Sequence, residues 1–305
     1  MNKFKPGLVH TPVTPFKRDQ SVDYDVYAKL IEWHLKNGAD ALALPMPEGE
    51  DMSLKDDELR KLVEFAIRQV KGRVPVIAHV SDAGTAIAVD RAKHAEKAGA
   101  AAIVSHPPYF WHTKPEMTLE HLVRIGASVK LPFLVYQPPV ESVGVTLTTK
   151  LTLQLIEKLE NFAGVVDAGM DWVYMVEAIS NGRRIRPDFQ LLPATDYMVS
   201  ARVMGGLGAF SALSAVAPNL VRRVYDACQK EDYKGARAGQ EDLATLRHLL
   251  KDPRLETGLK VALGAMGREC GVPRPPVRPL GEVERGRMTD ALAKMAALRS
   301  EPRGW

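Results

Sequence analysis

The sequence has little cysteine, no long apolar run and no block of like charge, and each lack excludes a class of protein. Cys228 and Cys270 are the only cysteines, and neither belongs to a CxxC pair, so we expect buried thiols in a reducing compartment. No apolar stretch is long enough to cross a membrane, and the first residues lack the apolar segment of a signal peptide. We therefore expect a soluble, cytoplasmic protein.

The charge is nearly balanced, because 41 basic residues face 37 acidic ones and the net charge of +4 is spread along the chain. This distribution gives no reason to expect nucleic acid or a membrane surface as a partner. A small-molecule substrate, including an anionic one, is compatible with the charge but not required by it. With 305 residues, 46% of them hydrophobic, the chain can bury a substantial core.

Short apolar runs alternate with longer segments of helical periodicity, which is the rhythm of βα units. Eight runs are candidate strands, the number found in a closed (β/α)8 barrel: 7–13, 40–45, 74–80, 101–106, 132–137, 162–168, 189–194 and 207–212. A doubly wound sheet is the alternative, but Thr11 and its neighbours stand where a glycine-rich phosphate turn would follow the first strand. Gly38 and Gly99 are each predicted to end a helix in a left-handed conformation.

No strand is predicted after the eighth unit. We therefore divide the chain into a TIM barrel over 1–228 and a C-terminal extension over 229–305, with helices predicted at 231–250, 254–270 and 281–299. The proline-rich segment 271–279 is predicted to run extended over the surface. We expect the extension to pack on the side of the barrel and to contribute to contacts between subunits.

Motifs at the predicted strand ends resemble, in order along nearly the whole chain, the dihydrodipicolinate synthase and N-acetylneuraminate lyase family. They are the segments 8–16 with 21–23, 46–50, 107–110, 135–138, 164–167, 194–196 with 205–211, and 259–263 with 273–276. The resemblance implies a (β/α)8 barrel with C-terminal helices, usually a homotetramer built as a dimer of dimers. It also implies an active site at the carboxyl ends of the strands.

The family's usual chemistry uses a lysine on the sixth strand, which forms an imine with a 2-oxo acid, and a tyrosine on the fifth strand, which relays protons. Val166 stands at the lysine position and carries no amine, so imine chemistry is not expected there. Lys114 and Lys130 lie in a loop and at the opposite face of the barrel, so neither is expected to replace it.

The second loop also departs from the family. Pro47 and Glu48 stand where the resemblance implies two hydroxyl residues that bind a carboxylate or support the tyrosine, although Gly49 and Glu50 are kept. Proline has no side-chain donor and an ionised glutamate repels an anion. Glu141 falls near the position of a carboxylate-binding arginine. We therefore do not expect dihydrodipicolinate synthase activity.

Tyr136 at the end of the fifth strand is the leading catalytic candidate, with His79 and His106 at the ends of the third and fourth strands. Each could instead be a buried strand-end residue whose polar atoms bond the backbone. Residues expected to line the substrate site are Glu48, Gly49, Glu50, Tyr109, Val166, Asp167, Asp196, Phe210 and Ser211.

Two of these assignments leave alternatives open. Tyr109 and Phe110 fall where the resemblance implies an aromatic residue that crosses a subunit interface, and plain interface packing is the alternative. Asp196 could bind substrate hydroxyl groups or cap a helix.

Three functions remain open: a lyase or hydratase that works by acid–base chemistry, a ligand-binding pseudoenzyme, and a metal-assisted aldolase or hydrolase. The histidines and carboxylates have no local spacing typical of a metal site, so we expect no metal and no cofactor. Tyr136 and the polar replacement Glu48 favour chemistry of some kind, because a pocket kept only for structure would more readily become apolar. Of the three functions, the acid–base lyase is preferred.

Overall fold

The computed structural model describes residues 4–109, 113–139, 145–194, 196–252 and 254–305. These residues form eight parallel strands in the order β7-β6-β5-β4-β3-β2-β1-β8, and β7 lies next to β8, so the sheet is a nearly closed barrel. The strands are β1 (Leu8–His10), β2 (Ala41–Leu44), β3 (Val76–His79), β4 (Ala102–Ser105), β5 (Phe133–Gln137), β6 (Phe162–Asp167), β7 (Gln190–Pro193) and β8 (Ala209–Ser211). Each lies within a predicted run, which confirms the (β/α)8 barrel.

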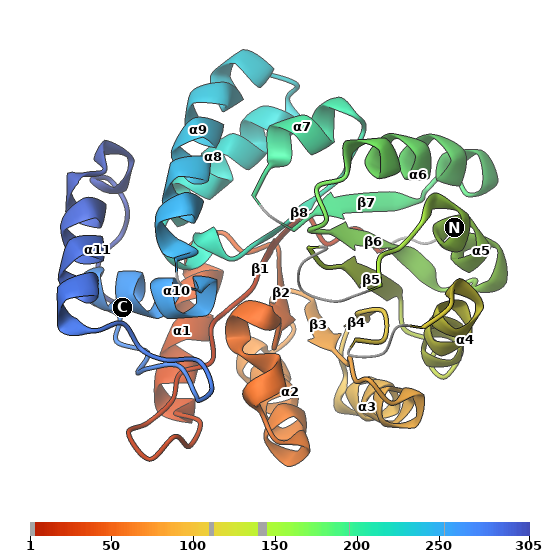
Figure 1. The fold of residues 1–305 in the computed structure, drawn as a ribbon, viewed down its shortest axis with the longest axis horizontal. Helices are drawn as coiled ribbons and strands as arrows, with labels where there is room; N and C mark the ends of the chain where they lie inside the picture. The colour runs from red at the N-terminus through yellow and green to blue at the C-terminus, as the bar shows by residue number, and fades with distance from the viewer. Residues whose placement is uncertain (1–3, 110–112, 140–144, 195, 253) are drawn as a thin grey trace.

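A helix follows each strand and covers the outside of the barrel (Figure 1): α1 (Tyr24–Lys36), α2 (Asp56–Val70), α3 (Thr85–Ala98), α4 (Pro115–Gly126), α5 (Thr149–Lys158), α6 (Trp172–Ile185), α7 (Met198–Val203) and α8 (Pro218–Gln229). The capping residues explain where several of them begin and end. Asp23 caps α1 by accepting the Val26 N–H, and Gly99 ends α3 with a φ of 94°. Gly38 is left-handed as well, with a φ of 86°.

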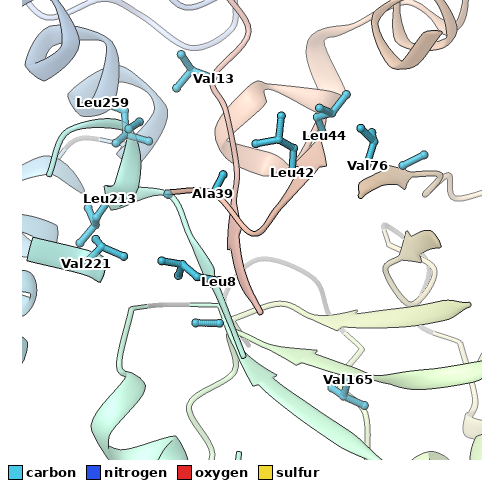
Figure 2. Packing of buried hydrophobic residues seen from close by; sticks show 14 of the residues in the cluster. Leu8, Val13, Ala39, Leu42, Leu44, Val76, Val165, Leu213, Val221 and Leu259 are labelled. Atoms are coloured by element: carbon cyan, nitrogen blue, oxygen red, sulfur yellow. The ribbon is translucent and has the colours of Figure 1, made fainter. Parts of the chain in front are cut away.

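Alternation along the strands separates two apolar layers. Val165 and Leu8 point outward into the layer between sheet and helices, part of which Figure 2 shows. Val166 and Phe210 point inward, into the cluster that fills the barrel. The inward or outward direction of a residue in this alternation, called its parity below, decides whether a strand-end side chain can reach the barrel interior.

The C-terminal extension consists of α9 (Tyr233–Leu250), α10 (Leu255–Ala265), α11 (Glu282–Lys294) and the short 3₁₀ helix η4 (Ala296–Leu298). Helix α9 packs along α8 (Figure 1), whereas α10 packs against the 3₁₀ helix η1 (Pro47–Gly49) in the loop after β2. The extension therefore reaches the carboxyl end of the barrel as well as its side. Within the described residues, no helix combines the length and the apolar character needed to cross a membrane.

The prediction that segment 271–279 runs over the surface is only partly right. Most of its residues are exposed or half-exposed, but Pro273 and Arg274 are buried. The Arg274 guanidinium donates to both carboxylate oxygens of Glu58, at 2.6 and 2.7 Å, and its backbone N–H donates to Glu50. These bonds tie the segment to α2 and to the loop after β2, and Glu58 gives the buried guanidinium the charged partner that it needs.

Candidate active site

A cavity of about 570 Å³ opens at the carboxyl ends of the strands, between the loops that follow β2, β4 and β5 and the junction of α9 with α10. This is the end of the barrel at which active sites of the fold lie. Its lining residues are Pro47, Glu48, Asp51, Met52, His106, Tyr109, Tyr136, Pro138, Pro139, Arg247, Arg254, Leu255 and Glu256. Of the predicted site residues, the structure brings Tyr136, His106, Glu48 and Tyr109 together here.

Tyr136 lies on the inner face of β5, in register with Val166 on β6. Its ring stacks on His106 with centroids 4.7 Å apart, and within the described residues its hydroxyl group has no hydrogen-bond partner. Among the described residues, therefore, the Tyr136 hydroxyl does not bond the backbone, which was the alternative to a catalytic role. Burial raises the pKa of Tyr136 well above its usual value, and Glu48 adds to this shift, so the phenol holds its proton at neutral pH.

His79 and His106 are neighbours on adjacent strands, with ring centroids 4.8 Å apart. Ser81 joins them, because its Oγ lies 2.6 Å from His79 Nε2 and accepts the backbone N–H of His106 at 2.7 Å. Burial lowers the pKa of both rings, to about 4 for His106, so both are neutral near pH 7. Nε2 of His106 is buried without a partner among the described residues. Only His106 of the pair lines the cavity.

Two carboxyl groups with shifted pKa values lie on the cavity wall: Glu48 on η1, which is buried, and Asp51 on η2 (Asp51–Ser53), whose side chain is 10% exposed. Burial raises the pKa of each to about 7. Asp51 lies 3.4 Å from His79 Nδ1, and Glu48 Oε2 has no hydrogen-bond partner within the described residues. Groups that titrate near neutrality can both release and accept protons at physiological pH.

Glu50 and Gly49, expected at the site, do not line the cavity. Glu50 forms a buried ion pair with Lys260 of α10 at 2.6 Å, so its charge is used between the barrel and the extension. The Gly49 carbonyl accepts the Thr14 hydroxyl at 2.6 Å. A Cβ at Gly49 would lie 3.1 Å from the Pro12 carbonyl oxygen, so the glycine permits close packing of this loop.

Three more of the predicted residues are absent from the cavity wall, two of them because of strand parity. Asp167 and Ser211 have the outward parity of Val165 and Ala209, on the helix side of the sheet. Phe210 points inward but lies within the barrel cluster, 1% exposed. Burial raises the pKa of Asp167 to about 6, yet its carboxylate accepts the Gly169 N–H at 3.0 Å.

Asp196 neither lines the cavity nor caps α7, whose N-cap residue is Tyr197. Its carboxylate accepts the Ser211 hydroxyl instead, and its backbone is left-handed, with a φ of 61°. Val166 is fully buried among apolar side chains of the barrel interior. Phe110 and Glu141 lie outside the described residues.

The sequence reasoning missed several residues of the site. Asp51 and Ser81 follow the expected strand ends, but the spacing alone does not predict the turn that aims Asp51 at His79. Arg247, Arg254 and Glu256 come from the extension, which was expected to pack on the side of the barrel. Within the part of the chain that the structure describes, no three metal-ligating side chains group as a metal site would require.

Comparison with known proteins places the chain in a family. The model of the dihydrodipicolinate synthetase family matches residues 4–295. A 4-hydroxy-tetrahydrodipicolinate synthase of Nitrobacter hamburgensis is 36% identical over 95% of this chain and 97% of its own length, and one of Bartonella bacilliformis is 31% identical over 97% and 99%.

Solved structures agree with this match. A putative dihydrodipicolinate synthetase from Pseudomonas aeruginosa has a TM-score of 0.90 and 27% identity, over 96% of this chain and 99% of that one. A prophage protein of the same family from E. coli K12, in complex with pyruvate, has a TM-score of 0.89 and 26% identity, over 95% and 98%. The chain therefore belongs to the dihydrodipicolinate synthetase family.

Proposed function

We propose that the protein is a lyase of aldolase or hydratase type that acts on a small oxo acid or a related compound by acid–base chemistry, without an imine lysine. One observation carries the proposal: Tyr136 and Glu48 line the same cavity, the described residues offer no hydrogen bond to the Tyr136 hydroxyl or to Oε2 of Glu48, and the strand position beside Tyr136 holds Val166. The described residues of this cavity wall supply proton donors and acceptors but no amine.

The protonation states suggest how the groups divide the work. Tyr136, protonated at neutral pH, donates to an oxygen of the substrate as negative charge develops on it. Glu48, with a pKa raised by burial to about 7, removes or returns a proton at carbon. His106, neutral and stacked on Tyr136, offers a further acceptor.

Loss of the imine has a cost that this arrangement must offset. In the family's usual reaction the imine withdraws electrons from the neighbouring carbon, and Val166 cannot do so. A substrate whose reactive proton is already acidic, next to a carbonyl or carboxylate, suits a site that works by proton transfer alone. We therefore favour removal of water or proton exchange over cleavage of a carbon–carbon bond.

Deuterium exchange across a set of candidate substrates tests the proposal. A panel of 2-oxo and 2-hydroxy acids is incubated with the protein in D₂O, and NMR follows exchange at carbon and formation of products. Tyr136→Phe should slow any such reaction by about a hundredfold or more. Its stability should change little, since the hydroxyl has no described partner to lose.

Tyr174→Phe is the matched control. It removes a buried hydroxyl group that lies 2.9 Å from the Thr152 hydroxyl and does not line the cavity. It should cost about 1 kcal/mol of stability and leave the reaction intact. Full activity in Tyr136→Phe would remove Tyr136 from the mechanism. No reaction of the wild type with any compound of the panel would favour a ligand-binding pseudoenzyme, and stoichiometric metal in elemental analysis would favour the metal-assisted alternative.

We further propose a cytoplasmic homotetramer. The family resemblance supports the assembly, and Cys228 and Cys270, both buried and unbonded, support a reducing compartment. Tyr109, the expected interface residue, lines its own chain's cavity, so a subunit contact there would adjoin the site. Light scattering should give the mass of four chains, and a monomer over a wide concentration range would contradict the assembly.

A further inference from the structure

Arg247 brings a positive charge from the C-terminal extension to the cavity wall. It lies in the last turn of α9, and its side chain lines the cavity together with Glu48 and Tyr136. Its charge acts against the rise in pKa that burial causes at Glu48, Tyr136 and Asp196. The guanidinium field therefore reaches the groups to which we assign the chemistry.

The guanidinium of Arg247 has no protein partner within the described residues, in contrast to Arg254 on the same wall. Arg254 lies 2.7 Å from the Glu256 carboxylate and is neutralised by it. Glu50 cannot neutralise Arg247 either, because one of its carboxylate oxygens accepts from Lys260 and the other from the Arg274 backbone N–H. Arg247 is thus the cavity cation whose charge the described residues leave uncompensated.

A position near a helix C-terminus alone does not explain this arrangement. A cation in the last turn stabilises the helix dipole wherever it points, and the neighbouring His248 of the same turn is exposed. Arg247 instead lines the cavity. On the same wall Pro47 has no side-chain donor for an anion, and Glu48 is itself an acid. A guanidinium at such a wall presents paired N–H donors that fit a carboxylate.

We propose that Arg247 binds the carboxylate group of the substrate, so that the C-terminal extension supplies the anion recognition that the loop after β2 does not. The proposal rests on the proposed function for the location of the site. It defines the ligand class as a small carboxylate that carries an oxo or hydroxy group, the carboxylate at Arg247 and the second oxygen toward Tyr136.

Calorimetry tests the proposal by binding alone. The probes are pyruvate and gluconate, each compared with a neutral counterpart, pyruvamide and sorbitol. We expect at least one carboxylate to bind and its neutral counterpart to bind at least tenfold more weakly. Arg247→Gln should weaken the bound carboxylate by tenfold or more, and Arg247→Lys should restore part of the loss, because lysine keeps the charge without the planar fork.

Arg237→Gln is the matched control, since Arg237 lies on the same helix, is exposed and pairs with Glu241. It should leave binding unchanged. Unaltered binding in Arg247→Gln, equal binding of the neutral counterparts, or no binding of either carboxylate would each overturn the proposal.

The same measurement separates this proposal from the acid–base function. Tyr136→Phe removes one neutral hydrogen bond to the second oxygen of the ligand, so it should weaken binding of the carboxylate much less than Arg247→Gln does, while it stops the reaction. Loss of binding in Arg247→Gln together with full activity in Tyr136→Phe would leave the anion site standing and refute the role of Tyr136. Retained binding in Arg247→Gln together with loss of activity in Tyr136→Phe would refute the anion site at Arg247 and leave the role of Tyr136 standing.

Discussion

Two glutamates of one loop, Glu48 and Glu50, are both buried but have opposite surroundings. Glu50 lies in an ion-pair seam made by Glu50, Lys260, Arg274 and Glu58, where each carboxylate meets a cation or a backbone donor. Glu48 lines the cavity, its Oε2 has no hydrogen-bond partner among the residues that the structure describes, and burial raises its pKa to about 7. Two residues of separation therefore distinguish a paired carboxylate from the one to which we assign a proton-transfer role.

The difference shows that burial alone does not identify a functional carboxylate. A buried charge with a partner holds elements together, and its partner keeps it ionised. A buried carboxyl group without a partner has a raised pKa and lowers stability when it ionises, a cost that is common at functional sites. The role of Glu50 can therefore be tested by the stability of variants, and that of Glu48 by how stability depends on pH.

The largest expected effect comes from breaking the seam. Lys260→Met removes the cation 2.6 Å from Glu50 and leaves that carboxylate buried, so the free energy of unfolding should fall by about 3–5 kcal/mol. Urea denaturation measures the change. The double variant Glu50→Gln with Lys260→Met removes both charges and should recover much of the loss. A single variant within about 0.5 kcal/mol of the wild type would show that the seam does not hold the extension.

A smaller effect is expected from Glu48→Gln, and it should depend on pH. Because burial raises the pKa of Glu48 from 4.5 to about 7, the folded protein binds the proton more tightly than the unfolded chain does. That contribution is present below the unfolded pKa and is lost as pH rises through about 7.

Glutamine mimics the protonated acid at every pH, so the variant should gain stability relative to the wild type between pH 4 and pH 8. The gain should reach at most about 3 kcal/mol, from 1.36 kcal/mol per pKa unit. Taking the difference between the two proteins cancels the opposite pH dependence of the buried histidines, whose lowered pKa values make stability rise with pH. A difference that does not vary with pH would place an unperturbed carboxylate at Glu48.

The barrel could be predicted from the sequence because βα alternation repeats eight times and each buried strand is a short apolar run. The location of Tyr136 and His106 followed, since the carboxyl ends of parallel strands meet at one end of the barrel. The prediction that Asp167 and Ser211 line the site overlooked the alternation of side chains along each strand. Val165 and Val166 lie in different layers, so Asp167 points the same way as Val165, outward. That signal was available in the strand pattern.

Other parts of the site were beyond sequence reasoning. Glu48 and Glu50 differ only in the path of two short 3₁₀ turns, one of which leaves Glu50 left-handed with a φ of 57°. Arg247 reaches the cavity from a helix far along the chain, and no local pattern encodes that contact. Long-range packing of the extension decided both outcomes.

The central claim is that this cavity works without an imine, and borohydride trapping tests it most directly. The protein is incubated with pyruvate and with other 2-oxo acids in the presence of borohydride, beside an imine-forming aldolase as positive control, and intact masses are measured. Val166 offers no amine, and Lys260, the one lysine buried among the described residues, pairs with Glu50 and lies off the cavity wall. We predict an unchanged mass, whereas an adduct mapped to any lysine would contradict the account and restore imine chemistry.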